Sequence, residues 1–325
     1  MNSLVALNGI QPWCSRFSVG RVRRKINKVA RQIKRRRLRR CVALTAPSPD
    51  ANQLMPFSPH CLTCHDDLLM AICSAKSLNL AVEEALPWIF HDDGSLTATD
   101  KQLLLFQFPG CRLVDRSEAD DFFKAPHLVP LAQARQKSVL LLKLADLQVF
   151  ARHDRILYVD SDILFFKRPH ALFHILENGN GNYFTKDIST AYIATLEVLQ
   201  ELTGVRPLER VNSGIFALNR TDIGLDRIAD TLPKIDMAKH PNWTLHRHLI
   251  EQTLVALLTT SSASGAAHLP PEYDLCFERG LHGAVCRHYV GVIREYFELE
   301  GLQTLLLEME FLSRWQRFAN RNRKH

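Results

Sequence analysis

The chain has 325 residues, of which 46% are hydrophobic, so it is long enough to build one large core or two small ones. No run approaches the roughly 18 apolar residues that a membrane-spanning helix needs. The sequence shows no secretory signal, and its eight cysteines do not require an oxidising compartment. These features predict a globular protein with a cytoplasmic location.

The net charge of +7 is concentrated at one end of the chain. Residues 1–50 hold 13 Lys or Arg and one acid, whereas the rest of the chain holds 28 basic and 33 acidic residues. Residues 16–40 predict a basic helix, because Val and Ile recur there at spacings of three and four. Such a helix suits an anionic membrane surface, at the inner membrane face; a flexible basic tail is the alternative. Nucleic acid is not expected, because no aromatic residues are interleaved with the charges.

The chain divides into a basic helical arm with a Pro-rich linker, residues 1–55, and a folded domain, residues 56–325. In chain order, the domain alternates between strand and helix patterns. Strands are predicted at 60–64, 85–91, 111–114, 155–159 and 211–217, and helices at 66–80, 99–106, 132–150, 245–258 and 299–318. This alternation predicts an α/β fold whose mixed, mostly parallel sheet is flanked by helices and binds ligands at the carboxyl ends of its strands.

Two aspartates follow the most apolar of these strands. Asp160 and Asp162 stand two apart, so in extended backbone their side chains point the same way. Neighbouring carboxylates repel and stay ionised most easily around a cation. Mg²⁺ or Mn²⁺ takes few carboxylates and fills its other positions with water and phosphate oxygens. The pair therefore predicts a divalent metal and a substrate that carries a pyrophosphate.

Several other interpretations of this pair remain open. A solvated turn is the simplest, but the flanking runs 156–159 and 163–166 are apolar. A phosphatase of the haloacid-dehalogenase type also places Asp-x-Asp after a strand, near the start of its domain. A nucleotidyltransferase, or a non-catalytic scaffold tethered to a membrane, is a further alternative. Cys61-Leu-Thr-Cys64-His65 matches a haem-attachment pattern and contains possible zinc ligands, but lacks a second ligand pair.

Four motifs, taken together and in this order, resemble glycosyltransferases with the GT-A fold, especially those of the retaining family-eight type. They are the run Ile156–Phe166 with its two aspartates, Asn212-Ser213-Gly214-Ile215-Phe216, Glu251-Gln252, and His288-Tyr-Val-Gly291-Val-Ile-Arg294. The last departs from the family pattern by having Arg in place of Lys. The resemblance covers roughly residues 60–296 and implies a metal-dependent hexosyltransferase that uses a nucleotide-sugar donor, a UDP-sugar.

The resemblance also implies roles for residues that bind the metal and the donor diphosphate. His288 becomes the third metal ligand beside Asp160 and Asp162. Gly291 allows the backbone to approach the diphosphate, and Arg294 binds it with two hydrogen bonds. Further donor contacts are expected from Lys143, which Asp146 is placed to orient, from Ser161 between the aspartates, and from Cys64, His65, Asp66 and Asp92 after the first two strands.

Catalytic and acceptor residues follow from the same resemblance. Gln252 is placed on the far side of the sugar from the leaving group, where an amide is a poor nucleophile, so transfer with retention is expected. Glu251 assists catalysis or binds the acceptor. Asn212, Ser213 and Gly214 line the acceptor side. The acceptor is a hydroxyl group on a glycan, a lipid-linked sugar or a protein, and the sequence does not say which.

Overall fold

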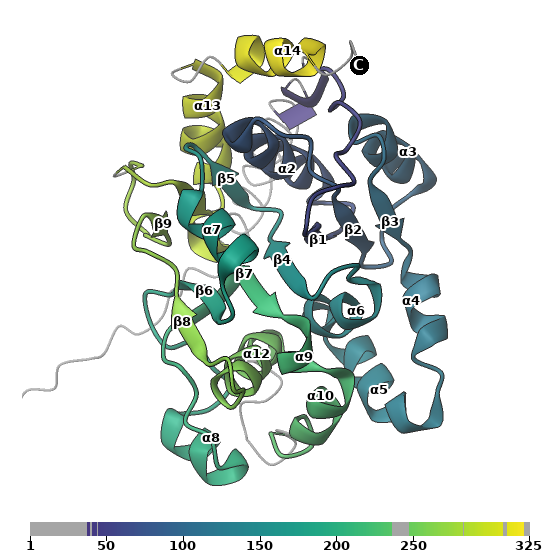
Figure 1. The fold of residues 1–325 in the computed structure, drawn as a ribbon, viewed down its shortest axis with the longest axis vertical. Helices are drawn as coiled ribbons and strands as arrows, with labels where there is room; N and C mark the ends of the chain where they lie inside the picture. The colour runs from purple at the N-terminus through teal and green to yellow at the C-terminus, as the bar shows by residue number, and fades with distance from the viewer. Residues whose placement is uncertain are drawn as a thin grey trace, which may run out of the picture.

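The computed structural model describes residues 38–39, 41–43, 45–235, 247–281, 283–307 and 311–321. A seven-stranded sheet with the order β3-β2-β1-β4-β7-β6-β8 forms its centre (Figure 1). The strands of this sheet are β1 (Pro59–Thr63), β2 (Ile89–Asp92), β3 (Arg112–Val114), β4 (Arg155–Val159), β6 (Asn182–Lys186), β7 (Val211–Asn219) and β8 (Ala266–His268). A smaller sheet contains β5 (Ile163–Phe165), β9 (Tyr273–Asp274) and β10 (Cys286–His288).

Helices connect most of these strands. The α-helices are α2 (Leu68–Val82), α3 (Ala98–Gln107), α4 (Arg116–Phe122), α5 (Val129–Lys137), α6 (Leu142–Phe150), α7 (His170–Asn178), α8 (Leu196–Thr203), α9 (Arg220–Ile223), α10 (Leu225–Thr231), α12 (Ile250–Thr260), α13 (Gln303–Leu307) and α14 (Phe311–Arg321). Short 3₁₀ segments are η1 (Pro126–Leu128), η2 (Val139–Leu141), η4 (Arg247–Leu249) and η5 (Gly291–Ile293), and η6 (Phe297–Leu302) is a π-helix.

The large sheet is mixed and mostly parallel, as expected. Neighbours β3, β2, β1 and β4 run parallel, β7 runs antiparallel to both β4 and β6, and β8 runs parallel to β6. The carboxyl ends of β1, β2 and β4 therefore meet the amino end of β7 at one edge. This edge is where a sheet of this kind binds its ligands.

Both faces of the sheet are covered, which explains why its strands are almost continuously apolar. Leu157 and Val159 of β4 pack in the core with α2, whereas Ile156 and Tyr158 pack in the core with α6 and α12. Figure 1 shows α2 and α14 on one side of the sheet, with α6 and α12 on the other. The alternation along β4 thus divides the chain's hydrophobic residues between two layers.

The small sheet lies next to the edge of the large sheet at which β4 ends. β5 follows β4 after a two-aspartate turn, and β10 pairs antiparallel with β5 so that His288 lies opposite Ile163. That register brings a residue from the last third of the chain beside Asp162. The sequence did not predict β5, β9 or β10, nor β6 and β8 of the large sheet.

Several predicted elements coincide with observed ones. The strand predicted at 155–159 is β4, and the helix predicted at 99–106 is α3, which begins at Ala98. A capping box fixes that start: Asp100 N donates to Thr97 Oγ1 at 3.2 Å, and Thr97 N donates to Asp100 Oδ2 at 2.8 Å. The helix predicted at 299–318 is instead divided among η6, α13 and α14.

The helix predicted at 132–150 is wrong as a single element. Ser138 adopts an extended conformation (φ −134°, ψ 106°) and separates α5 from α6. In a straight helix, Arg135 and Asp146 would lie about 16 Å apart along the axis. Here Arg135 Nε and Nη2 donate to the two oxygens of Asp146 at 2.7 and 2.9 Å. The expectation that Asp146 orients Lys143 is therefore also wrong, because its carboxylate is paired with Arg135.

The basic helix predicted at 16–40 lies outside the described residues, apart from residues 38–39. Where the description begins, Leu38 and Val42 are buried in the core that contains α2. The Pro-rich segment packs against the folded domain. Ser48 N donates to Gln107 O of α3 at 2.8 Å, and Phe57 is fully buried. Within the described part of the chain, no helix is both long and apolar enough to span a membrane.

Candidate active site

Two aspartates and one histidine meet beyond the carboxyl end of β4. His288 Nε2 lies 3.1 Å from Asp162 Oδ1 and 3.8 Å from Asp160 Oδ2. One ligand atom from each of the three residues lies within 4.8 Å of the other two. Two carboxylate oxygens and an imidazole nitrogen form a donor set that suits a divalent ion such as Mn²⁺. No cysteine belongs to a comparable cluster in the described ranges, so the zinc alternative at Cys61 and Cys64 gains no support.

The opposite charges of His288 and the two aspartates stabilise one another. Burial alone would lower the pKa of His288, but the carboxylates of Asp162 and Asp160 raise it above its ordinary value. Burial alone would raise the pKa of Asp162, but His288 and Arg294 lower it. The space between the two aspartates thus favours positive charge.

Asp160 is also held by Lys143 and Tyr158. Lys143 Nζ lies 3.0 Å from Asp160 Oδ2, and the hydroxyl of Tyr158 donates to Asp160 Oδ1 at 2.8 Å. Burial alone would lower the pKa of Lys143, but the carboxylates of Asp160 and Glu251 raise it. Lys143 therefore stays charged although its side chain is almost fully buried. These contacts leave Asp160 with a fixed orientation toward the cluster.

The ring of His288 is oriented by Asn212. Asn212 Oδ1 lies 2.9 Å from His288 Nδ1 and accepts from Gly214 N at 3.0 Å. Asn212 Nδ2 donates to Asp187 Oδ2 at 3.0 Å, which identifies the amide oxygen as the atom that faces the histidine. Nδ1 must then carry the proton of the neutral ring, so the lone pair on Nε2 points toward the aspartates.

Gly214 provides the space for that ring. A Cβ added to Gly214 would lie 2.3 Å from His288 Cε1 and 2.4 Å from His288 Nδ1, closer than van der Waals contact allows. Gly214 O also accepts from Asp160 N at 2.8 Å. The Asn-Ser-Gly motif on β7, expected on the acceptor side, thus contacts both His288 and Asp160.

Glu251 and Gln252, neighbours on α12, both contact Ser213. Ser213 Oγ donates to Glu251 Oε2 at 2.9 Å, and Ser213 N donates to Gln252 Oε1 at 3.2 Å. Gln252 Nε2 donates to Ala191 O at 2.9 Å. Burial raises the pKa of Glu251 to about 7, against the opposing effects of Lys143 and Ser213. Glu251 lies 3.9 Å from Lys143 and so belongs to the same network as Asp160.

Arg294 lies on the third side of the cluster. Its Nη2 is 2.5 Å from Asp67 Oδ2, and its Nε is 3.7 Å from Asp162 Oδ2. Asp67 therefore anchors the guanidinium that was expected to bind the diphosphate. Gly291 adopts a positive φ of +49°, which favours glycine, and begins the turn that leads to Arg294.

The loops after β1 and β2 carry the residues expected to bind the nucleoside. His65 Nδ1 lies 2.7 Å from Asp100 Oδ2, and half of the His65 side chain is exposed. Asp92 is committed to the turn: its Oδ1 accepts from Gly94 N at 2.8 Å, and its Oδ2 lies 3.0 Å from Lys101 Nζ. Asp67, in the loop after β1, contacts Arg294 and so connects this loop to the cluster of Asp160, Asp162 and His288.

The structure also brings in residues that the sequence did not single out. Tyr158 was counted as an apolar strand residue, yet its hydroxyl contacts Asp160. Its position two residues before Asp160 on a strand was the available signal, because such residues face the same way. Asp187 and Ser74 carried no such signal: Asp187 supports Asn212, and Ser74 Oγ donates to Asp160 O at 3.2 Å.

Comparisons with solved structures return glycosyltransferases. The apo structure of the bifunctional glycosyltransferase WbbM is 13% identical over 82% of this chain and 53% of that chain, with a TM-score of 0.50. The apo form of mouse xyloside xylosyltransferase 1 is 18% identical over 71% of this chain and 97% of that chain, with a TM-score of 0.49. Galactosyltransferase LgtC, in complex with donor and acceptor sugar analogs, is 13% identical over 72% and 87%, with a TM-score of 0.46.

The chain has a GT-A-like fold. That conclusion rests on the mixed seven-stranded sheet and on its likeness to WbbM. The chain matches no family model and no curated protein sequence. A fold of this kind is compatible with more than one function, and the residues of the site determine which one this chain has.

Proposed function

We propose that the chain is a metal-dependent glycosyltransferase of the retaining family-eight type. It would transfer a sugar from a nucleotide-diphosphate donor, a UDP-sugar, to a hydroxyl acceptor. The observation that carries this proposal is the meeting of Asp160, Asp162 and His288 beyond the carboxyl end of β4 in a GT-A-like sheet. A haloacid-dehalogenase-type phosphatase or a nucleotidyltransferase would use the aspartates, but neither explains a histidine held in place by Asn212.

Asp160, Asp162 and His288 would hold Mn²⁺ or Mg²⁺, and the bound ion would neutralise charge on the leaving nucleoside diphosphate. Arg294 lies beside Asp162 with its guanidinium positioned by Asp67, so it is placed to bind diphosphate oxygens. Lys143 pairs with Asp160. Ser161, between the aspartates, and the exposed His65 supply further donor contacts in this proposal.

Gln252 and Glu251 approach the site from α12 and contact it through Ser213. Gln252 uses its amide to hold Ser213 N and Ala191 O, which fixes its orientation and leaves it unsuited to act as a nucleophile. This supports transfer with retention, in which the acceptor attacks from the face that the leaving group departs. Glu251, with a pKa near 7, is suited to exchange a proton with an acceptor hydroxyl near neutral pH. Asn212, Ser213 and Gly214 would line the acceptor path.

The arm supplies the proposed location. Its basic residues at 16–40 would attract anionic lipids and place the enzyme at the inner membrane face, close to a glycan or lipid-linked acceptor. This part of the proposal rests on sequence alone.

Donor hydrolysis tests the proposed activity. The full chain is incubated with UDP- and GDP-sugars with Mn²⁺ and with EDTA, and release of the nucleoside diphosphate is measured. We expect turnover of at least one donor in Mn²⁺, and a loss of about 100-fold or more in Asp162→Asn, since one metal ligand loses its charge. Asp121→Asn, at an exposed aspartate on α4, is the matched control and should keep full activity. Absence of turnover by any donor, or full activity in Asp162→Asn, would refute the proposal.

A further inference from the structure

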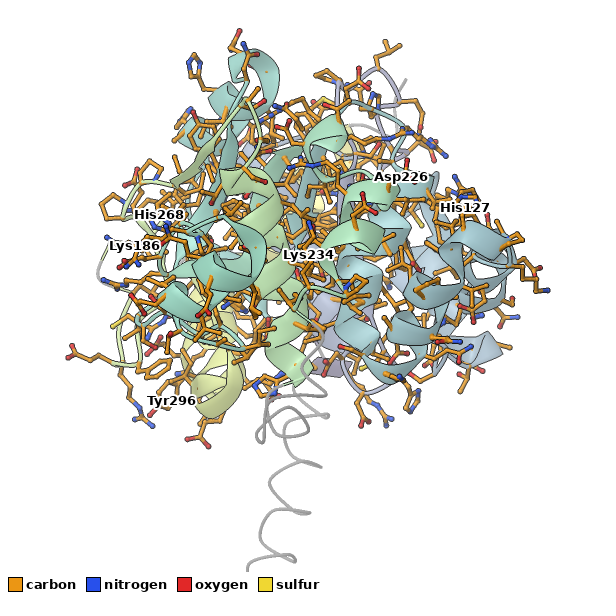
Figure 2. The ribbon with its side chains drawn as sticks, turned by 90° about the horizontal axis from the view of Figure 1, so that it is seen from below. His127, Lys186, Asp226, Lys234, His268 and Tyr296 are labelled. Atoms are coloured by element: carbon orange, nitrogen blue, oxygen red, sulfur yellow. The ribbon has the colours of Figure 1, made fainter. Side chains whose placement is uncertain are left out.

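A groove lies at the opposite end of the central strands from the cluster of Asp160, Asp162 and His288. It encloses about 710 Å³, within the range of ligand pockets in proteins. α4, η1, α6, α9 and α10 contribute to its wall, together with the turn before β4. Figure 2 shows His127 and Asp226, from η1 and α10, on the same side of the molecule. Its polar and aromatic wall residues include Phe122, His127, Gln148, Asp154, Arg220 and Asp226.

Two strands fix the distance from this groove to the candidate active site. Asp154 directly precedes β4 and Asp160 directly follows it, so they are separated by roughly 20 Å of extended chain. Arg220 follows β7, whereas Asn212 and Gly214 lie at the beginning of that strand. The groove is therefore separate from the metal ligands and from the proposed acceptor path.

Gln148 indicates that the groove accommodates a polar ligand. Its side chain lies on α6, lines the groove and is only 7% exposed. No hydrogen bond joins its amide to another described residue, and the amide nitrogen and oxygen are not fully buried, so they are open to the groove. A ligand group that both donates and accepts would satisfy them.

The remaining wall residues narrow the class of ligand. Asp154 and Asp226 supply two carboxylates at the groove, whereas Arg220 supplies one guanidinium, whose Nη1 already donates to Ala151 O at 3.0 Å. This balance disfavours phosphates and nucleotides, which require excess positive charge. Phe122 is 47% exposed and offers an aromatic surface beside the polar groups. Carboxylates beside an aromatic ring suit a ligand whose hydroxyl groups both donate and accept hydrogen bonds and whose ring has an apolar face.

We propose that this groove binds a neutral oligosaccharide. The sugar hydroxyls would pair with the Gln148 amide and with the carboxylates of Asp154 and Asp226, while a sugar ring packs against Phe122. This inference is independent of the proposed transferase activity, since it uses none of the residues of the metal site. It gives the molecule a second carbohydrate contact on the far edge of the sheet.

Saturation-transfer NMR on the full chain in EDTA tests the groove. The probes are neutral trisaccharides of glucose, galactose, mannose, xylose or N-acetylglucosamine. We expect at least one to bind, and its affinity to fall about tenfold in Gln148→Leu and in Phe122→Ala, as loss of one hydrogen bond or ring contact predicts. Phe122 is half exposed, so its variant keeps the test valid if Gln148→Leu does not fold.

Two controls separate this proposal from sugar binding elsewhere. Phe106→Ala removes a phenylalanine that is 62% exposed on α3, outside the groove, and should bind the trisaccharide like the parent. Asp162→Asn alters the metal cluster and should also leave this binding unchanged. Failure of every trisaccharide to bind, or loss of binding in Asp162→Asn with full affinity in both groove variants, would overturn the proposal.

Discussion

His288 is positioned by the amide of Asn212, which contacts Nδ1 of the ring, away from the Nε2 atom that faces the aspartates. Asn212 accepts from the imidazole at 2.9 Å and is itself fixed by Gly214 N and Asp187. Partners of this kind set the tautomer and direction of a ligating histidine, and their loss weakens metal binding by about 10- to 100-fold.

We therefore expect Asn212→Ala to weaken Mn²⁺ binding by about 10- to 100-fold while the chain stays folded. Electron paramagnetic resonance titration of free Mn²⁺ measures the affinity, and circular dichroism checks the fold. Asn178→Ala, at an exposed asparagine on α7, is the matched control and should bind Mn²⁺ like the parent. Equal affinity in Asn212→Ala and Asn178→Ala would show that His288 does not depend on this amide.

Glu251 makes the stability of the metal-free chain depend on pH. Burial raises its pKa from 4.5 to about 7, so the folded chain holds this proton more tightly than the unfolded chain does. As pH rises from 4.5 through about 7, the free energy of unfolding should fall, by an amount on the order of 3 kcal/mol. Glutamine resembles the protonated side chain at every pH, so Glu251→Gln should avoid this loss.

Urea denaturation in EDTA at about pH 4 and about pH 8 tests this expectation. Glu251→Gln should gain stability relative to the parent as the pH rises. Glu177→Gln, at an exposed glutamate on α7, should follow the parent throughout. Parallel stability profiles of Glu251→Gln and the parent would contradict the argument.

Single residues also show what the sequence could and could not reveal about the site. Asp160 and Asp162 were predictable because they follow an apolar strand, which fixes their direction locally. Asp146 was misplaced because its partner, Arg135, reaches it only after the chain bends at Ser138. Asp187 was missed because nothing in the sequence around it indicates that its carboxylate contacts Asn212, which is 25 residues further along the chain.

At the scale of elements, β7 approaches the His288 ring of β10 at Gly214. The Cβ of any other residue at position 214 would occupy the place of the His288 ring. This explains in packing terms why the Asn-Ser-Gly strand and the histidine motif occur together. The sequence showed both motifs, but the contact between them depends on the register of β10 on β5.

Gly214→Ala should consequently displace His288 and weaken Mn²⁺ binding by about tenfold or more. Isothermal titration of Mn²⁺ measures the loss. Gly181→Ala is the matched control: its added Cβ would also crowd a neighbour, Tyr183 Cε2 at 2.9 Å, but far from the metal ligands. If both alanine variants lower Mn²⁺ affinity equally, the effect comes from general destabilisation and not from the histidine.

At the scale of the whole molecule, strand direction was the part of the fold that the sequence could not supply. Alternating strand and helix patterns predicted a mostly parallel sheet, and β1 to β4 follow it. β7 runs against its neighbours although it is as deeply buried as β4. The hydrophobic pattern of a buried strand does not indicate its direction in the sheet. The direction of β7 depends instead on the path of the preceding connection, α8 and the loop after it.

The two ends of the described chain are joined by Trp315. Its ring is fully buried, its Nε1 donates to Ala46 O at 2.7 Å, and Lys76 Nζ lies 4.9 Å from the ring centroid. Lys76 also donates to Thr45 Oγ1 at 2.7 Å, so α14, α2 and the segment before β1 form one unit. The amphipathic pattern predicted a C-terminal helix but could not indicate that its tryptophan contacts residues 45–46.

Trp315→Ala should lower the free energy of unfolding by about 3–5 kcal/mol, the usual cost of removing a large buried side chain. Trp315→Phe keeps a ring in the core but loses the hydrogen bond to Ala46, so it should lose only about 1–2 kcal/mol. Urea denaturation of the full chain measures both, with Gln316→Ala on the exposed face of α14 as the control. A Trp315→Ala variant as stable as Gln316→Ala would mean that the contacts of Trp315 with Ala46 and Lys76 do not stabilise the fold.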